Sequence, residues 1–186
     1  MVRRLLYHFW ILLNFKARRF INAALHIAVQ RSHPLAVEFF LRLGADCTTR
    51  NLDGDTALLA AIKKKDQQHM LEIVRLLLTR SNPANCDRYG NAAYHLAVRL
   101  VDRHDIFEEI LRHGTCGLDE TNLSGETVLH LAVKCRNQKA IESLLQRNVD
   151  MHQKDGKDSK SALELAKGDE PIQQIFAKYI VESSSK

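Results

Sequence analysis

The feature of this 186-residue sequence that most limits its fold is a short segment that recurs at a nearly constant interval. Three clear copies are present: SGETVLHLAV at 124–133, YGNAAYHLAV at 89–98 and NAALHIAV at 22–29. Two weaker copies are DGDTALLAAI at 53–62 and SKSALELA at 159–166. One aligned position is occupied in turn by His26, Leu59, His95, His130 and Glu164, at intervals of 33, 36, 35 and 34 residues. Such a period is typical of proteins built from stacked repeats.

Each copy predicts a turn followed by two short helices. In the fourth copy, the turn sequence NLSG precedes Thr127, a residue type that favours the N-cap of a helix. A second apolar stretch, AIESLLQRN at 140–148, has helical spacing. One helix pair cannot bury its own apolar face, so neighbouring pairs must stack. The sequence therefore predicts an all-α repeat domain over 22–181, in units 22–52, 53–88, 89–123, 124–157 and 158–181, followed by a polar tail at 182–186.

The repeated segment resembles the ankyrin repeat signature T-P-L-H-x-A. The match begins at Thr56 and Thr127 and, with substitutions, near Ala23, Ala92 and Ser161. LRLGAD at 41–46 also resembles the end of an ankyrin repeat. The resemblance implies an ankyrin solenoid that binds a partner protein on its concave surface. In this reading the signature residues have structural roles; they are His26, Thr56, His95, Thr127 and His130.

Within that family, three features are similar to inhibitors of the IκB type, including the short viral mimics. They are DGDTALLAAI at 53–62, the lengthened inter-helix stretch KKKDQQHM at 63–70, and KDGKDSKSALELA at 154–166. The resemblance implies inhibition of Rel/NF-κB factors. Such inhibitors capture basic nuclear-localisation segments, however, and a lysine-rich concave face would repel them.

Several classes of function are disfavoured by the motifs. The sequence has no glycine-rich phosphate loop, nucleophile elbow or zinc-ligand pair. The histidines recur in the repeats, which argues against a unique active site. We therefore expect neither catalysis nor a cofactor or metal. The four cysteines form no C-x-x-C pair, and a large repeat core needs no disulfide, so free thiols and a cytoplasmic or nuclear location are expected.

Basic residues follow the repeated signatures, whereas the second helices carry several glutamates. This segregation predicts a basic concave face that binds a protein with an acidic surface, at Arg31, Lys63, Lys64, Arg88, Tyr89, Arg99 and Lys134. Nucleic acid is a weaker candidate, because no aromatic side chains suited to stacking accompany the lysines. The expected function is that of a regulatory adaptor or inhibitor. The alternatives are an IκB-like inhibitor, a small regulatory subunit of a protein kinase, and a scaffold attached to a membrane surface.

The amino-terminal segment LLYHFWILLNF at 5–15 is the most apolar stretch, and basic residues flank it. Eleven residues are too few to span a membrane, for which about 20 are needed. A secretory signal would require cleavage inside the first repeat. We expect residues 1–21 to form a helix that caps the first repeat and covers Leu25, Ile27 and Phe39. The alternatives are docking to a partner or to a membrane surface, with Phe9 and Trp10 in contact.

Overall fold

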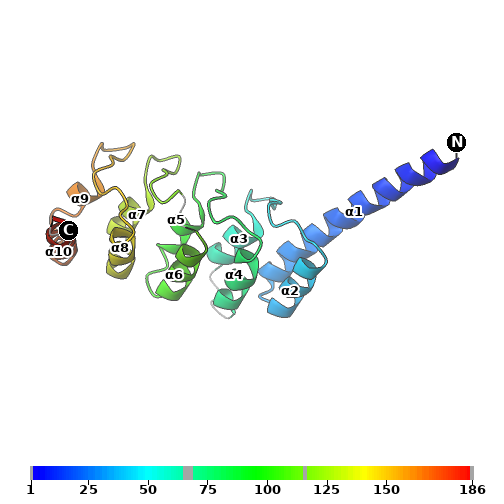
Figure 1. Ribbon diagram of the computed structural model, residues 1–186, viewed down its shortest axis with the longest axis horizontal. Helices are drawn as coiled ribbons and strands as arrows, with labels where there is room; N and C mark the ends of the chain where they lie inside the picture. Colours follow the sequence, from blue (N-terminus) through cyan, green and yellow to red (C-terminus); the bar gives the residue numbers. More distant parts are fainter. Residues whose placement is uncertain (1, 65–68, 115–116, 185–186) are drawn as a thin grey trace. The chain divides into compact units, whose positions relative to one another are not determined.

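A computed structural model of the chain describes residues 2–64, 69–114 and 117–184, and the side chains of residues 16–64, 69–114 and 117–181. Within these ranges the chain forms ten helices and one isolated β-bridge, between Lys154 and Ser161 (Figure 1). The prediction of an all-α fold built from helix pairs is confirmed.

The helices follow one another as five pairs along the chain. The first two pairs are α1 (Val2–Gln30) with α2 (Pro34–Arg42) and α3 (Ala57–Lys63) with α4 (Met70–Leu78). The next two are α5 (Ala93–Ala97) with α6 (His104–His113) and α7 (Val128–Lys134) with α8 (Gln138–Leu145). The last is α9 (Ala162–Leu165) with α10 (Glu170–Ser184). Helix α10 thus extends into the predicted polar tail.

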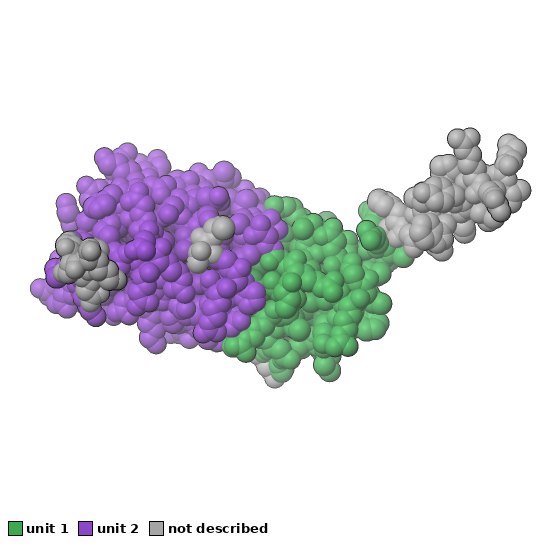
Figure 2. All heavy atoms as spheres, viewed as in Figure 1, with its two compact units in different colours: residues 1–81 green, residues 82–186 purple. Residues whose placement is uncertain are grey.

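The chain divides into two compact units, Met1–Ser81 and Asn82–Lys186, shown in different colours in Figure 2. Unit 1 holds the first two helix pairs, and its core contains the fully buried Leu25, Val37, Val74 and Leu77. Unit 2 holds the other three pairs. Its core is built around the side chains of Phe107, Ile110, Ile141, Leu144 and Phe176.

An Asn or Asp side chain organises the turn that precedes each of three helices. The Oδ1 atom of Asn122 accepts hydrogen bonds from the backbone N–H groups of Ser124 (2.9 Å) and Glu126 (3.0 Å). Asn51 and Asp87 occupy the same place before α3 and α5, and each accepts from the residues two and four positions later. Short polar side chains favour such turns because they satisfy the local backbone themselves.

Helices α3 and α7 begin at the predicted threonine caps. The Thr56 and Thr127 hydroxyls accept from the backbone N–H groups of Leu59 and His130, each at 3.4 Å. The ring of His130 completes the box, because its Nδ1 accepts from the Thr127 N–H at 3.2 Å. Its Nε2 lies 3.1 Å from the carbonyl oxygen of Lys160 in the next turn. The histidine therefore ties its own helix to the following repeat.

Successive turns of unit 2 lie directly against each other. The Leu123 N–H donates to the Tyr89 carbonyl at 3.0 Å, and the Gly156 N–H donates to the Gly125 carbonyl at 3.2 Å. Gly125 has φ +74°, and an added Cβ would lie 2.3 Å from the nitrogen of Gly156. Only glycine permits both this backbone conformation and this approach.

The amino-terminal segment differs from the prediction. Helix α1 continues without a break across the predicted boundary between residues 21 and 22, so no separate helix precedes the first repeat. Leu25 is buried, but Ile27 and Phe39 are 57% and 56% exposed. The expectation that both are covered by a cap is therefore wrong. The side chains of Phe9 and Trp10 lie outside the described residues, and their predicted contacts remain untested.

Candidate functional site

The predicted basic residues of unit 1 are largely engaged within the protein. Arg31 is exposed in the turn after α1. The Lys63 ammonium group lies 2.6 Å from Oδ1 of Asp55, whose side chain is almost fully buried. The Lys64 ammonium group donates to the hydroxyl of Ser32. Two of the three cations thus hold helix α3 to neighbouring turns.

Lys134 in unit 2 repeats the arrangement of Lys63. Its Nζ lies 2.7 Å from Oε1 of Glu126 and 3.5 Å from Oδ2 of Asp155. Burial opposes the ionisation of Glu126, but hydrogen bonds from Lys134 and Asn122 prevail and lower the pKa of that carboxyl group. For Lys134, the cost of burial is likewise outweighed by the two carboxylates, which raise its pKa. This cluster is therefore fully charged at neutral pH.

The repeat between these two pairs lacks the carboxylate. Asn91 stands where the others have Asp55 and Glu126, and its Oδ1 accepts from the Asn122 amide at 3.0 Å. The matching basic residue is Arg99, which is exposed. Its positive charge contributes to the lowered pKa of Glu126. The guanidinium group of Arg99 therefore has no carboxylate at position 91, where the other two repeats have one for their lysine.

Exposed apolar side chains lie at the turns, and two of them, Leu52 and Leu123, were not among the residues predicted to bind a partner. In unit 2, Tyr89 is 59% exposed and Leu123 is 80% exposed, and their backbones are hydrogen-bonded to each other. The Arg88 guanidinium carbon lies 5.4 Å from the centre of the Tyr89 ring, within the range of a cation–π contact. In unit 1, Leu52 is fully exposed in the equivalent turn. The recurrence of leucine inside the turn sequences NLDG and NLSG was the signal that could have identified Leu52 and Leu123.

The histidines are engaged in the repeat framework. His26 Nε2 lies 3.0 Å from the Thr49 carbonyl oxygen, and the Ala92 N–H donates to His95 Nδ1 at 3.2 Å. Burial lowers the pKa of the His95 imidazole, and this outweighs the opposing effect of the Glu120 and Glu126 carbonyls. A buried neutral imidazole in a capping position stabilises the turn, as predicted from its recurrence.

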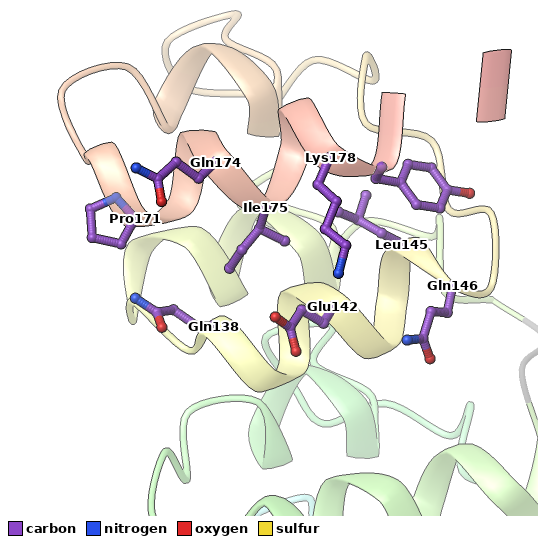
Figure 3. A pocket seen from close by; sticks show the side chains of 9 residues that line it. Gln138, Glu142, Leu145, Gln146, Pro171, Gln174, Ile175 and Lys178 are labelled. Carbon is purple, nitrogen blue, oxygen red and sulfur yellow. The ribbon is translucent and has the colours of Figure 1, made fainter. Parts of the chain in front are cut away.

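Unit 2 also contains a groove of about 400 Å³ between α8 and α10. Figure 3 shows Gln138 and Glu142 on α8 and Gln174 and Lys178 on α10 around it. These four side chains are all exposed. The groove has the character of a solvated seam between two outer helices.

Two further observations concern the thiols and the membrane. Cys47, Cys86 and Cys135 have free thiols, and Cys116 lies outside the described residues. Burial raises the pKa of the Cys47 and Cys135 thiols, which keeps them protonated at neutral pH. Among the residues described, no helix combines the length and the apolar character that a membrane crossing requires.

Comparison with known proteins gives the same repeat along most of the chain. Residues 25–117 match the family model described as ankyrin repeats (3 copies), and residues 124–156 match the ankyrin repeat model. An intracellular phospholipase A2 of Caenorhabditis elegans is 30% identical over 66% of this chain and 12% of its own length. Human B-cell lymphoma 3 protein is 32% identical over 76% of this chain and 32% of its own length.

A third relative, an L-asparaginase of Dirofilaria immitis, is 28% identical over 71% of this chain and 22% of its own length. The chain thus corresponds to less than a third of each of these three relatives. Two of the names denote different enzymes and the third denotes no reaction, so the names share no activity. The repeated turns, caps and histidines lie mostly in the residues that match the ankyrin repeat models, and the chain belongs to the ankyrin repeat family.

Proposed function

We propose that this protein is a non-catalytic regulatory adaptor or inhibitor that binds its partner through exposed side chains of unit 2. Ankyrin repeats generally mediate protein–protein binding. The residues that we assign to binding are Arg88, Tyr89, Arg99 and Leu123, and we name this set the tip surface. Compared with the set expected from sequence, it gains Leu123. It leaves out Arg31, which lies in unit 1, and the three lysines Lys63, Lys64 and Lys134, which are bonded within the protein.

The exposure of Tyr89 and Leu123 on two hydrogen-bonded turns is the observation that carries the proposal. Neither side chain packs in the core, so the fold does not require large apolar residues at these two positions. Tyrosine and arginine are enriched among the residues that dominate binding energy at protein interfaces. The Arg88 guanidinium group lies over the Tyr89 ring, and Arg99 adds a second exposed cation in the same repeat. This combination is suited to a partner segment that carries apolar and acidic side chains.

A second candidate is an IκB-like inhibitor of Rel/NF-κB factors. The similarity to B-cell lymphoma 3 protein, itself an IκB-family member, favours it. The pairing of Lys63 with Asp55 and of Lys134 with Glu126 and Asp155 also weakens the electrostatic objection to a basic ligand. Lysines neutralised in this way repel a basic segment less than their number suggests.

Selection of binding peptides from a random displayed library, with the full chain as target, tests the function. We expect enrichment of peptides with apolar and acidic residues. The double variant Tyr89→Ser, Leu123→Ser should weaken their binding about tenfold or more, as loss of an interface anchor does. Leu52→Ser removes an equally exposed leucine from unit 1 and serves as the matched control.

The sign of the enriched charge separates the two candidates. Acidic peptides whose affinity also falls in Arg99→Glu support the adaptor proposal. Basic peptides whose affinity rises in Arg99→Glu support the IκB-like alternative. If enriched peptides bind the double variant and the parent equally well, the tip surface is not the binding site and the proposal is rejected.

A further inference from the structure

Unit 1 has a second exposed apolar surface, on its first helix pair. Two of its residues lie on α1, where Phe20 is 75% exposed and Ile27 is 57% exposed. Two lie on α2 and one at its C-cap, with exposed fractions of 79% for Leu35, 56% for Phe39 and 51% for Leu43. We name these five residues the α1–α2 face. The two on α1 are seven residues apart and the other three are four residues apart, which places the members of each group along one side of its helix.

Comparison with an internal repeat shows whether a preceding or a following repeat would cover this face. The pair α7–α8 aligns with α1–α2 at a constant offset of 104 residues, which pairs Ile27 with Leu131 and Phe39 with Ser143. Leu131 and Ser143 are 4% and 8% exposed, whereas Ile27 and Phe39 are more than half exposed. Since α1–α2 has the following pair α3–α4 packed against it, the missing cover is that of a preceding repeat.

A contact of the internal repeat supports this direction. Arg147, the counterpart of Leu43, reaches back to the preceding helix α6, where its guanidinium nitrogen lies 3.3 Å from Oε2 of Glu108. Leu35 corresponds to Lys139, which is itself exposed, so the positions that a preceding pair covers are those of Ile27, Phe39 and Leu43. The α1–α2 face is therefore the surface onto which a preceding helix pair would stack.

The α1–α2 face is apolar although it is exposed, whereas the matching surface of α7–α8 is more polar although part of it is buried. At the matching positions the α7–α8 pair has the exposed Lys139, the buried Ser143 and the half-buried Arg147, whereas the α1–α2 pair has leucine, phenylalanine and leucine. A terminal repeat normally needs a polar outer face to remain soluble. At the other end of the chain, the first turns of α10 have that character, since Gln173, Gln174 and Lys178 are exposed there. A group of five exposed large apolar side chains on one helix pair indicates a partner that covers it.

The charges around the α1–α2 face identify the occupant. Lys16 lies four residues before Phe20 and Arg31 four residues after Ile27, so a positive charge stands at each end of the α1 stripe. Arg19 and Arg50 line a hollow of about 590 Å³ beside Ile27, which also contains His26 and Leu52. Residues 1–50 contain eight basic and two acidic residues, and one of these acids, Glu38, is paired with Arg42 at 2.6 Å. A second copy of this face would oppose like charges, which disfavours a symmetric dimer.

We infer that the α1–α2 face binds an amphipathic helix of another protein, with an apolar stripe and acidic residues on both sides of it. The stripe from Lys16 to Arg31 spans 15 residues of helix and turn, or about 22 Å at the rise of an α-helix, enough to pair with a helix of about four turns. This site is separate in sequence from the tip surface and does not depend on it.

Binding of two synthetic helices tests the inference with the full chain. Both carry leucine at positions i, i+4, i+7 and i+11; one carries glutamate and the other lysine at the remaining positions. The acidic helix should bind about tenfold or more tightly than the basic one near 0.05 M salt, and the difference should shrink near 0.5 M, since screening weakens surface attraction. Amide chemical shifts should change along α1 and α2.

Two substitutions of exposed residues serve as variants, and one of them uses a residue that the chain itself carries at the matching position. Phe39→Ser restores the serine of α8, and Ile27→Gln removes the apolar contact on α1. Both side chains are exposed, so thermal unfolding should not change while affinity for the acidic helix falls about tenfold. Tyr89→Ser, Leu123→Ser should leave that affinity unchanged, which separates this site from the tip surface. Equal affinity for the two helices, or full binding by the doubly substituted α1–α2 variant, overturns the inference. So does a parent chain that sediments as a dimer and becomes monomeric in that variant.

Discussion

Substitution of Gly125 by alanine tests whether contact between turns stabilises the stack in unit 2. The added Cβ would lie 2.3 Å from the nitrogen and 2.4 Å from the Cα of Gly156. Both atoms belong to the backbone, so a side-chain rotation cannot relieve the overlap. The turn that follows Asp155 must move, and the hydrogen bond from Gly156 to Gly125 must lengthen.

The expected loss of unfolding free energy has two parts. The first is the left-handed backbone of Gly125, with φ +74°, which costs a residue with a Cβ about 1–2 kcal/mol. The second is the overlap itself, for which overpacking costs about 1–3 kcal/mol. Gly168 in the same unit has φ +98° and nothing within 4 Å of a built Cβ, so Gly168→Ala contains the first part alone. The two variants should therefore differ by about 1–3 kcal/mol.

Urea unfolding of the full chain, followed by far-ultraviolet circular dichroism and by hydrogen exchange, measures this difference. We expect Gly125→Ala to lower the midpoint more than Gly168→Ala and to accelerate exchange of the Gly156 amide. Equal midpoints for the two alanine variants, with the Gly156 amide still protected, would show that the turns stand beside each other without stabilising contact. In that case the argument from the overlap would be refuted.

Two further predictions concern ionisation. The pKa of His95 is lowered from 6.5, so at mildly acidic pH the unfolded state binds a proton that the native state does not. The unfolding free energy should therefore fall as pH drops below about 6.5. Urea titrations between about pH 5 and 7.5 should show a weaker pH dependence for His95→Gln than for the parent. Lys134→Met leaves the carboxylates of Glu126 and Asp155 without their cation and should destabilise the chain more than Arg99→Met does. Equal midpoints for the two methionine variants would show that the lysine pair is dispensable.

Much of the fold is written in local sequence. Three groups bond to the backbone within five residues of themselves: the Oδ1 atom of the Asn or Asp in the turn, the threonine hydroxyl at the N-cap, and Nδ1 of the histidine three residues later. Such interactions can be predicted from a single repeat, and five copies reinforce the prediction. The same holds for Pro34, which starts α2 where its missing N–H costs nothing.

The assignment of the charged residues could not be made locally. The sequence shows lysines after the signatures, but not that Lys63 and Lys134 turn back onto carboxylates eight residues earlier. Nor does composition distinguish an apolar residue that a cap covers from one that remains exposed, as Ile27 and Phe39 do. Both outcomes depend on contacts between segments, and the continuous helix α1 changes those contacts for the whole first repeat.

Departures from the repeated pattern are the positions at which function can be sought in such a chain. A residue that every copy retains is explained by stacking, because each copy faces the same packing problem. Asn91 removes the carboxylate that neutralises Lys63 and Lys134 in other copies, and so leaves Arg99 available to a ligand. Phe39 replaces the covered Ser143 with an exposed ring. Asn91 gains a buried hydrogen bond from Asn122 and Phe39 an edge contact with Phe40, but neither contact requires the exposed guanidinium group or the exposed ring, so we propose a binding role for both.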